Sequence, residues 1–255
     1  MLHVYGHPAS QPSRAVIWAC VLHELPIRLI RPALEGGEGI NPRGQVPTID
    51  DEGFVLTEMP AILAYLGEKH RWADCYPENI RARARITQYL HAHHSLTRLA
   101  TTKLMAPHVL VAFGGIPAPN PLSYVNNICI RASMEDEQGL VNGQKLISEV
   151  IDFLERAYLG ENDFIAGTPH ASIADFACYE EIGQLQQANL FDLAEKKVMY
   201  SWFRRMQDLP YHEEVHRYNS ALGDIKSTPN SMERFSNAEA QAFGALSDLS
   251  SVELA

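Results

Sequence analysis

The chain has 255 residues, of which 46% are hydrophobic, and a formal net charge of −10. This length permits one large domain or two of ordinary size, with enough apolar residues for real hydrophobic cores. Because the net charge is negative and lysine and arginine residues form no cluster in the sequence, nucleic acid is not an expected partner.

The cysteines and the N-terminal residues indicate in which cellular compartment the protein is expected. Cys20, Cys75, Cys129 and Cys178 lie far apart, without the spacing of a metal-binding or disulfide pattern. The sequence therefore predicts no metal site, and a reducing cytoplasm is the expected location. The first ten residues lack a basic region followed by a long apolar run, and no segment approaches membrane-spanning length, so no membrane association is expected.

The first part of the chain alternates strand and helix patterns. Leu2–Gly6 alternates like a strand, Ser13–Leu22 has a helical apolar period, and Pro26–Ala33 has strand character that ends at Pro32. Two β-branched runs and a helix follow between Asn41 and Glu68. This order predicts a compact α/β domain at residues 1–72, with a single mixed sheet.

The stretch from Asn41 to Glu68 reads NPRGQVPTIDDEGFVLTEMPAILAYLGE. Pro47 stands where an apolar strand begins, which suits a proline whose N–H is not needed or whose peptide bond is cis. Thr57 is the expected N-cap of the helix, and Glu58 places negative charge on its first turn. The free N–H groups near Glu58 and Met59 are suited to hold an anion.

After a polar linker at residues 70–79, the pattern becomes helical. One helix is predicted from Ile80 to Ala106, stopped by Pro107, and a second region of helical period runs from Asn127 to Tyr158. These helices begin a second domain, expected at residues 80–218.

A capping-box spacing marks the next helix of this domain. Ser172 and Asp175 have the S-x-x-D spacing ahead of an apolar run, which predicts a buried core helix with Asp175 as a structural acid. A further helix carries Trp202 and ends near Pro210. The tail at residues 219–255 is rich in serine, asparagine and alanine, and short helices or mobility are expected there.

Several motifs, in this order, resemble the cytosolic glutathione transferase family, most closely its theta-like kind. They are SQPSRAV at 10–16, NPRGQVPTI at 41–49, LTEMPAILAYL at 56–66, YPENIRARARITQYL at 76–90, HHSLTR at 93–98 and FIAGTPHASIAD at 164–175. The resemblance covers about residues 1–218. It implies a thioredoxin-like N-terminal domain, an all-helical C-terminal domain and a homodimer.

The resemblance also implies a catalytic hydroxyl. A thiol with a pKa of about 8.5 needs a hydrogen bond and positive potential to become a thiolate at neutral pH. Ser10 lies between the first strand and the first helix, and resembles the serine that theta-like enzymes direct at the glutathione sulfur. Ser13 is the second candidate. Tyr5 is a third, because other classes of the family carry a catalytic tyrosine near this point. Arg14 is expected to form a structural ion pair.

For the tripeptide, the resemblance points to the 41–68 stretch. Val46 and Pro47 resemble the segment whose backbone pairs with the cysteinyl part of glutathione, and Gln45 is placed to hold the glycyl end. Glu58 and Met59 match the pair that holds the γ-glutamyl group, with Glu58 facing its ammonium and the Met59 amide its carboxylate. Met59 replaces the usual serine of the family, so one hydroxyl donor is lost.

A second departure is the segment between Pro26 and Asn41, which is shorter than in the family and retains only Arg43 and Gln45 nearby for the glycyl end. In the helical domain, Arg98 matches an arginine that theta-like enzymes point towards the active site, and His94 lies one turn before it. Apolar groups from Leu104 to Phe113, with the tail after Tyr218, are expected to wall the electrophile site.

The sequence therefore predicts a glutathione transferase that joins the glutathione thiolate to hydrophobic electrophiles, with glutathione as co-substrate and a role in detoxification. Glutathione-dependent peroxide reduction would use the same apparatus. The alternative is a transferase-like module without catalysis that binds ligands or proteins, which the loss of the serine at Met59 would allow.

Overall fold

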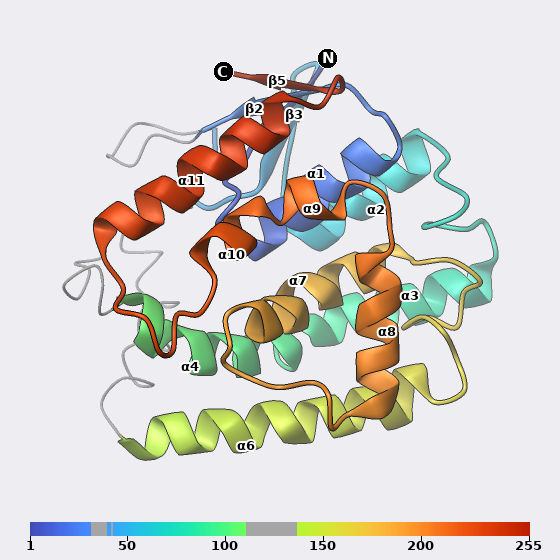
Figure 1. Ribbon diagram of the computed structural model, residues 1–255. Coiled ribbons are helices and arrows are strands. Elements are labelled where there is room, and N and C mark those ends of the chain that lie inside the picture. Colours follow the sequence, from blue (N-terminus) through green and yellow to red (C-terminus); the bar gives the residue numbers. More distant parts are fainter. Residues whose placement is uncertain (32–39, 42, 111–136) are drawn as a thin grey trace.

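The computed structural model describes residues 1–31, 40–41, 43–110 and 137–255 (Figure 1). The N-terminal elements are β1 (Leu2–Tyr5), α1 (Gln11–Leu22), β2 (Ile27–Ile30), β3 (Thr48–Asp51), β4 (Phe54–Thr57) and α2 (Met59–Lys69). This confirms the predicted order of strands and helices. Most of the segment between Pro26 and Asn41, including the predicted shortening, lies outside the described residues.

The sheet is mixed, with the strand order β4-β3-β1-β2-β5. β1 runs parallel to β2, pairing Val4 with Leu29, and antiparallel to β3, pairing Val4 with Ile49. All three of these side chains are almost fully buried. Figure 1 shows α1 and α2 between the sheet and the helices of the second domain. The sheet thus buries an apolar face beneath α1 and α2, as expected for a thioredoxin-like domain.

The second domain is helical. Its elements are α3 (Ile80–His93), α4 (Thr97–Leu110), α6 (Glu137–Leu154), a π-helical turn (Glu155–Leu159), α7 (Ile173–Gln187), α8 (Lys197–Gln207), α9 (His212–Val215), α10 (Arg217–Leu222) and α11 (Met232–Ser247), and the chain ends with β5 (Val252–Leu254). Among the described residues, no helix is both long and apolar enough to cross a membrane.

At the centre of this domain lies α7, in which every residue from Ile173 to Leu185 is buried. The predicted structural acid is confirmed. Asp175 Oδ2 accepts the Ser172 N–H at 2.8 Å, and Oδ1 accepts the Trp202 indole N–H at 2.9 Å and the Ile165 N–H at 2.8 Å. Burial raises the pKa of Asp175, and these donors oppose that shift.

Two expectations for the helices were wrong. The single helix predicted from Ile80 to Ala106 is in fact two helices, because residues 94–96 form a turn between His93 and Thr97. The Thr97 hydroxyl, at the start of the second helix, lies 2.9 Å from the Tyr89 hydroxyl. Pro107 does not stop α4, which continues to Leu110. A proline removes one backbone hydrogen bond, a loss that tertiary packing can offset.

The tail also differs from its prediction. Instead of short helices or a mobile segment, it contains the 16-residue helix α11, whose buried residues Phe235, Ala238, Ala242 and Leu246 recur every three or four positions. β5 then pairs parallel to β2, with Val252 opposite Ile27. The expected boundary between residues 218 and 219 falls inside α10. Because α11 has this regular apolar stripe, burial against the protein stabilises it despite a polar composition.

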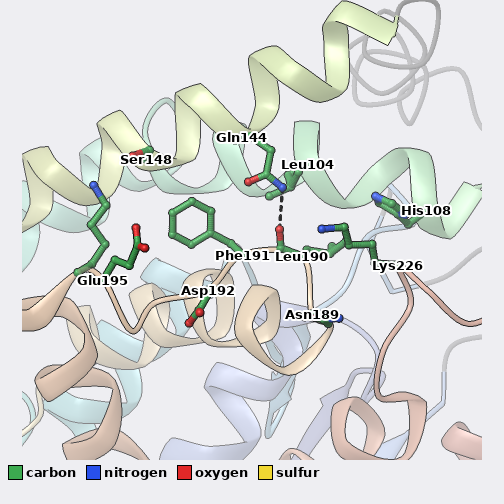
Figure 2. A pocket seen from close by; sticks show the side chains of 11 residues that line it. Leu104, His108, Gln144, Ser148, Asn189, Leu190, Phe191, Asp192, Glu195 and Lys226 are labelled. Atoms are coloured by element: carbon green, nitrogen blue, oxygen red, sulfur yellow. Dashed lines mark hydrogen bonds between the residues drawn. The ribbon is translucent and has the colours of Figure 1, made fainter.

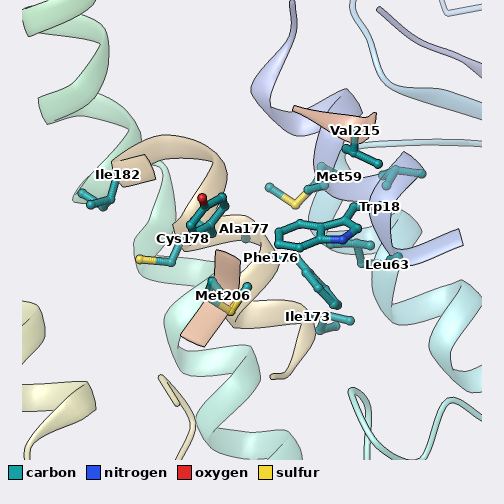
Figure 3. Packing of buried hydrophobic residues seen from close by; sticks show 14 of the residues in the cluster. Trp18, Met59, Leu63, Ile173, Phe176, Ala177, Cys178, Ile182, Met206 and Val215 are labelled. Atoms are coloured by element: carbon teal, nitrogen blue, oxygen red, sulfur yellow. The ribbon is translucent and has the colours of Figure 1, made fainter. Parts of the chain in front are cut away.

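The two domains share a core centred on Trp18 of α1 (Figure 3). Its side chain is fully buried, its N–H donates to Pro210 O at 2.9 Å, and its ring centroid lies 5.2 Å from that of Phe176 on α7. In the same cluster, Figure 3 shows Met59 pointing towards the Trp18 ring. α1 is therefore fixed from both domains, which also fixes the position of its N-terminus.

Candidate functional site

Ser10 caps the N-terminus of α1. Its backbone is extended, with φ −87° and ψ 120°, and its Oγ accepts the Ser13 N–H at 3.4 Å. The first turn of α1 holds no acidic residue, so the positive end of the helix dipole is not neutralised from within the helix. Because Ser10 is half-buried and its hydroxyl proton is not used by this cap, the O–H can donate to an anion at the helix start.

The rival hydroxyls are placed differently. Ser13 has no exposed surface, and its Oγ lies unpaired against Gly6, where a Cβ would come within 3.4 Å of that oxygen. Tyr5 is the last residue of β1, paired with Ile30 and Thr48 in the sheet. Of the three hydroxyl residues, Ser10 is the one that stands at the helix terminus.

The structural role expected for Arg14 is confirmed. Its Nε donates to Glu180 Oε2 at 2.6 Å, and its Nη1 donates to Pro8 O at 2.9 Å. Both side chains of the pair are 1% exposed, and Glu180 also contacts His216 Nε2 at 2.9 Å. Burial alone would raise the pKa of Glu180, but His216 and Arg14 outweigh it and lower that pKa. Arg14 therefore ties the loop before Ser10 to α7.

The loop before β3 is held by Asn41, whose Nδ2 donates to Gln45 O at 2.8 Å and whose Oδ1 accepts the Arg43 N–H at 2.9 Å. The Val46–Pro47 peptide bond is cis, one of the two arrangements that the sequence left open. Gln45 and Val46 are half-buried, and the ladder of β3 begins only at Thr48. The Val46 backbone therefore takes no part in the strand pairing that is described for β3.

Glu58, rather than Thr57, is the N-cap of α2, so that expectation was one residue early. Its φ of 70° is rare for a residue other than glycine, and costs about 1 to 3 kcal/mol. The carboxylate is half-exposed and contacts Arg43 Nη1 at 3.0 Å and His94 Nε2 at 3.8 Å. Backbone strain beside a helix N-terminus with an exposed carboxylate is typical of a binding site.

Met59 is the first residue of α2, and only 3% of it is exposed, since its side chain points into the shared core (Figure 3). Its backbone N–H still belongs to the first turn, where helix amides lack partners within the helix. The Met59 amide is therefore suited to an anion even though its side chain faces away from solvent.

Arg98 on α4 reaches the start of α1. Its Nη1 donates to Gln11 Oε1 at 2.9 Å and to Glu181 Oε1 at 2.8 Å. Glu181 is buried on α7 and also accepts the Thr101 hydroxyl at 2.5 Å. Burial alone would raise the pKa of Glu181, but Arg98 and the other partners lower it. This carboxylate stays ionised and fixes Arg98 beside the residue that follows Ser10.

His93, 3.8 Å from Glu181, is not a second cation of this network. Burial lowers the pKa of His93 to about 4, so it is neutral at pH 7. The neighbouring residue, His94, has a side chain that is 62% exposed and faces Glu58. The structure thus brings Ser10 and Arg98 to one end of α1, and places His94 beside the α2 N-terminus.

A cavity of about 290 Å³ opens beside Ala9 and Gln11 at the start of α1. Its walls are mostly apolar, with Met105 and Val109 from α4 and Phe235 from α11, and Arg98 also faces it. Met105, Val109 and the residues after Tyr218 match the expected electrophile walls. Leu104 does not line this cavity but a second one, on another face of α4, and residues 111–113 lie outside the described part of the chain.

That other cavity is larger, about 730 Å³, and lies between α4, α6 and the segment after α7 (Figure 2). Figure 2 shows Phe191 standing between that segment and α6, while the Gln144 amide donates to Leu190 O at 2.7 Å. Neither Ser10 nor another residue of the α1 N-terminus lines it. We therefore assign the candidate site to the smaller cavity, which Ala9 and Gln11, the two neighbours of Ser10 in the chain, line at the N-terminus of α1.

Sequence reasoning missed four contributors to this site, namely Gln11, Glu180, Glu181 and Phe235. Two consecutive glutamates inside the apolar run IADFACYEEIGQL were a readable signal, because buried carboxylates need partners. Phe235 was identifiable only through the apolar spacing of α11.

Three comparisons with known proteins all point to the same family. The sequence profile of "Glutathione S-transferase, N-terminal domain" matches residues 4–74. Glutathione S-transferase T1 of Arabidopsis thaliana is 31% identical over 84% of this chain and 87% of the relative. Human glutathione S-transferase theta-2B is 30% identical over 72% of this chain and 71% of the relative. The structure of human glutathione transferase theta-2, complexed with glutathione and an unknown ligand, aligns with a TM-score of 0.74 at 24% identity, over 95% and 99% of the two chains.

Proposed function

This chain belongs to the glutathione S-transferase family, of the theta-like kind, and we propose that it activates the glutathione thiol through Ser10. The observation that carries this proposal is the position of the Ser10 hydroxyl. It stands half-buried at the unneutralised N-terminus of α1, beside an apolar cavity that Arg98 also faces. A thiol with a pKa of about 8.5 is mostly protonated at pH 7, so a donor and positive potential there favour the thiolate.

In this proposal the tripeptide lies along the edge of the N-terminal domain. The Val46 backbone beside cis Pro47 pairs with the cysteinyl part, Gln45 holds the glycyl end, and Glu58 receives the γ-glutamyl ammonium. The Met59 N–H receives the γ-glutamyl carboxylate at the α2 N-terminus. The strained Glu58 backbone supports this arrangement, and the human theta-2 structure of the same fold is a complex with glutathione.

The electrophile occupies the apolar cavity beside α1. The thiolate attacks its electrophilic carbon, a carbon–sulfur bond forms, and the leaving group departs with its electron pair, while the thiol proton has already gone to solvent. Rate acceleration comes from thiolate stabilisation and from holding the two reactants together. Arg98 adds positive potential on the same side. We propose a cytoplasmic homodimer acting in detoxification, as is usual for this family.

The experiment is a titration with glutathione while the ultraviolet absorbance of the thiolate is recorded. We expect the signal in the wild type and its loss in Ser10→Ala, with turnover reduced about 100- to 1000-fold, the usual effect of removing one donor from a developing or bound anion. Ser13→Ala and Tyr5→Phe are matched hydroxyl deletions. If either of these loses the thiolate signal while Ser10→Ala keeps it, Ser10 is not the activating hydroxyl.

Binding without a thiolate signal in the wild type would instead favour the non-catalytic ligand carrier. The absence of binding at millimolar glutathione would overturn the glutathione site as a whole. A panel of aryl halides, alkyl halides and organic hydroperoxides then separates conjugation, dehalogenation and peroxide reduction.

A further inference from the structure

At the opposite end of α1 from Ser10, three metal-ligating side chains meet. His23 follows the last residue of α1, and Asp74 and Cys75 lie in the linker before α3. His23 Nε2 is 3.0 Å from Asp74 Oδ1 and 3.7 Å from Cys75 Sγ. One ligand atom from each residue lies within 4.8 Å of the other two. Residues 51 positions apart in the sequence thus bring nitrogen, oxygen and sulfur donors together.

The His23 ring is fixed from two directions. Nδ1 lies 2.8 Å from Ala19 O, so Nε2 is the ring nitrogen that faces the Asp74 carboxylate and the Cys75 sulfur. The ring also stacks on Trp72, with centroids 4.3 Å apart and an interplanar angle of 12°. A histidine whose second nitrogen is held by a carbonyl is the usual arrangement of a metal ligand.

Cys75 is equally well positioned. It is 1% exposed, and its carbonyl oxygen accepts the Ile173 N–H of α7 at 3.0 Å. Burial raises the pKa of the Cys75 thiol, so without a metal it stays protonated. The Asp74 side chain is 52% exposed, which leaves one side of the cluster open to water.

We propose that His23, Asp74 and Cys75 form a binding site for a zinc-type divalent ion, with a water molecule as fourth ligand. Mixed nitrogen, sulfur and carboxylate donors with one open position suit Zn²⁺. Around a tetrahedral zinc ion the nitrogen and oxygen ligands are about 3.3 Å apart and the nitrogen and sulfur ligands about 3.6 Å apart. The observed separations of 3.0 and 3.7 Å are within a few tenths of an ångström of these values.

Binding replaces the Cys75 S–H bond with a sulfur–zinc bond, and the thiol proton, together with a proton held on His23 Nε2, goes to solvent with no change in oxidation state. The ion would then link the C-terminal end of α1 to the linker, and through the Cys75 carbonyl to α7. Its role is structural, because α1 separates it from Ser10, and it adds a contact at the junction of the two domains.

The test uses tag-free full-length protein without glutathione, since glutathione itself binds metals. Co²⁺ serves as a spectroscopic substitute for Zn²⁺. We expect one equivalent to produce a sulfur-to-cobalt charge-transfer band and to quench Trp72 fluorescence. The band should disappear in Cys75→Ser, and affinity should fall at least tenfold in His23→Ala and in the exposed variant Asp74→Asn. Zn²⁺ should raise the midpoint of thermal unfolding in the wild type.

His70→Ala is the matched control, because His70 also stacks on Trp72, at 6.0 Å, but does not belong to the cluster. It should keep the band, the quenching and the thermal shift. Circular dichroism confirms that each variant is folded. The proposal is overturned if the wild type gives no band at micromolar Co²⁺, or if Cys75→Ser and Asp74→Asn bind as the wild type does. In that case His23 and Asp74 form an ion pair and nothing more.

Discussion

The two halves of the candidate site are built in different ways. The half that we propose for glutathione comes from one stretch, Asn41 to Met59, whose turns and caps are local. The half that we propose for the electrophile takes Arg98 from α4, held by Glu181 of α7 83 positions away, and Phe235 from α11. Apart from Met59, whose side chain is buried in the shared core, the exposed side chains of the local half can be altered with little effect on the fold, whereas the other half is part of the core.

The adjacent glutamates of α7 make this difference concrete. Glu180 faces Arg14 of α1 and His216 before α10, and Glu181 faces Arg98 of α4. Both are 1% exposed. Two neighbouring carboxylates thus connect α7 to α1 on one side and to Arg98 of the cavity wall on the other.

The largest expected effect comes from Glu180→Ala. It would leave the Arg14 guanidinium buried without its carboxylate, so we expect the free energy of unfolding to fall by about 3 to 5 kcal/mol in chemical denaturation. Glu149→Ala is the control, since its pair with Lys145 is exposed on both sides and should change stability by less than about 0.5 kcal/mol. Equal small losses would show that α7 does not depend on this pair.

Met59→Ser tests where the boundary between the halves lies. Met59 belongs to the glutathione stretch, but its side chain is in the core, so replacing it with serine leaves a cavity. We expect a loss of about 2 to 4 kcal/mol in unfolding free energy. Because the side chain points inward, glutathione affinity measured by calorimetry should tighten by less than about tenfold, the effect of one neutral hydrogen bond. A larger gain would mean that the missing hydroxyl, and not packing, governs this position.

Local signals explain what could be predicted from the sequence. The order of the N-terminal strands and the Ser172–Asp175 cap follow from β-branched and capping residues acting within a few positions, whereas Pro47 indicated a cis bond only as one of two possibilities. Ser10 was placed at a helix start by the same kind of signal. The family motifs then supplied its expected role.

Non-local packing explains what could not. Nothing near Pro107 indicates that α4 would continue through it, since its helix is stabilised by elements far away in sequence. The polar composition of the tail concealed the stripe of α11, and no sequence spacing shows that His23 would meet Asp74 and Cys75. Composition describes a segment, whereas burial depends on what the fold places against it.

Glu58→Gln should affect the local half alone. The substitution keeps the shape of the side chain and removes the charge that would face the γ-glutamyl ammonium, worth about 1.5 to 3 kcal/mol. We expect the glutathione dissociation constant to rise at least tenfold in calorimetry. The free energy of unfolding should change by less than about 1 kcal/mol, because the pair with Arg43 is half-exposed. Loss of stability with unchanged affinity would place Glu58 in the fold instead of the site.

The last expected effect concerns the proton of His93, the final residue of α3, which lies 3.8 Å from Glu181 of α7. Burial lowers the pKa of His93 to about 4, against an ordinary value of 6.5, so between these limits the unfolded chain binds a proton that the folded chain does not. The free energy of unfolding should therefore fall as pH falls from 6.5 towards 4, by at most about 1.4 kcal/mol per pH unit from this residue.

His93→Gln isolates this contribution. Burial also lowers the pKa of His212, to about 3, and that residue adds a similar slope in both proteins, so the difference between wild type and variant reports His93 alone. Denaturation between pH 6.5 and 5 avoids the Glu181 carboxylate, whose lowered pKa gives a stability that is lost only below its ordinary value of 4.5. Parallel curves for the two proteins would mean that His93 takes up its proton in the folded state and is paired with Glu181 after all.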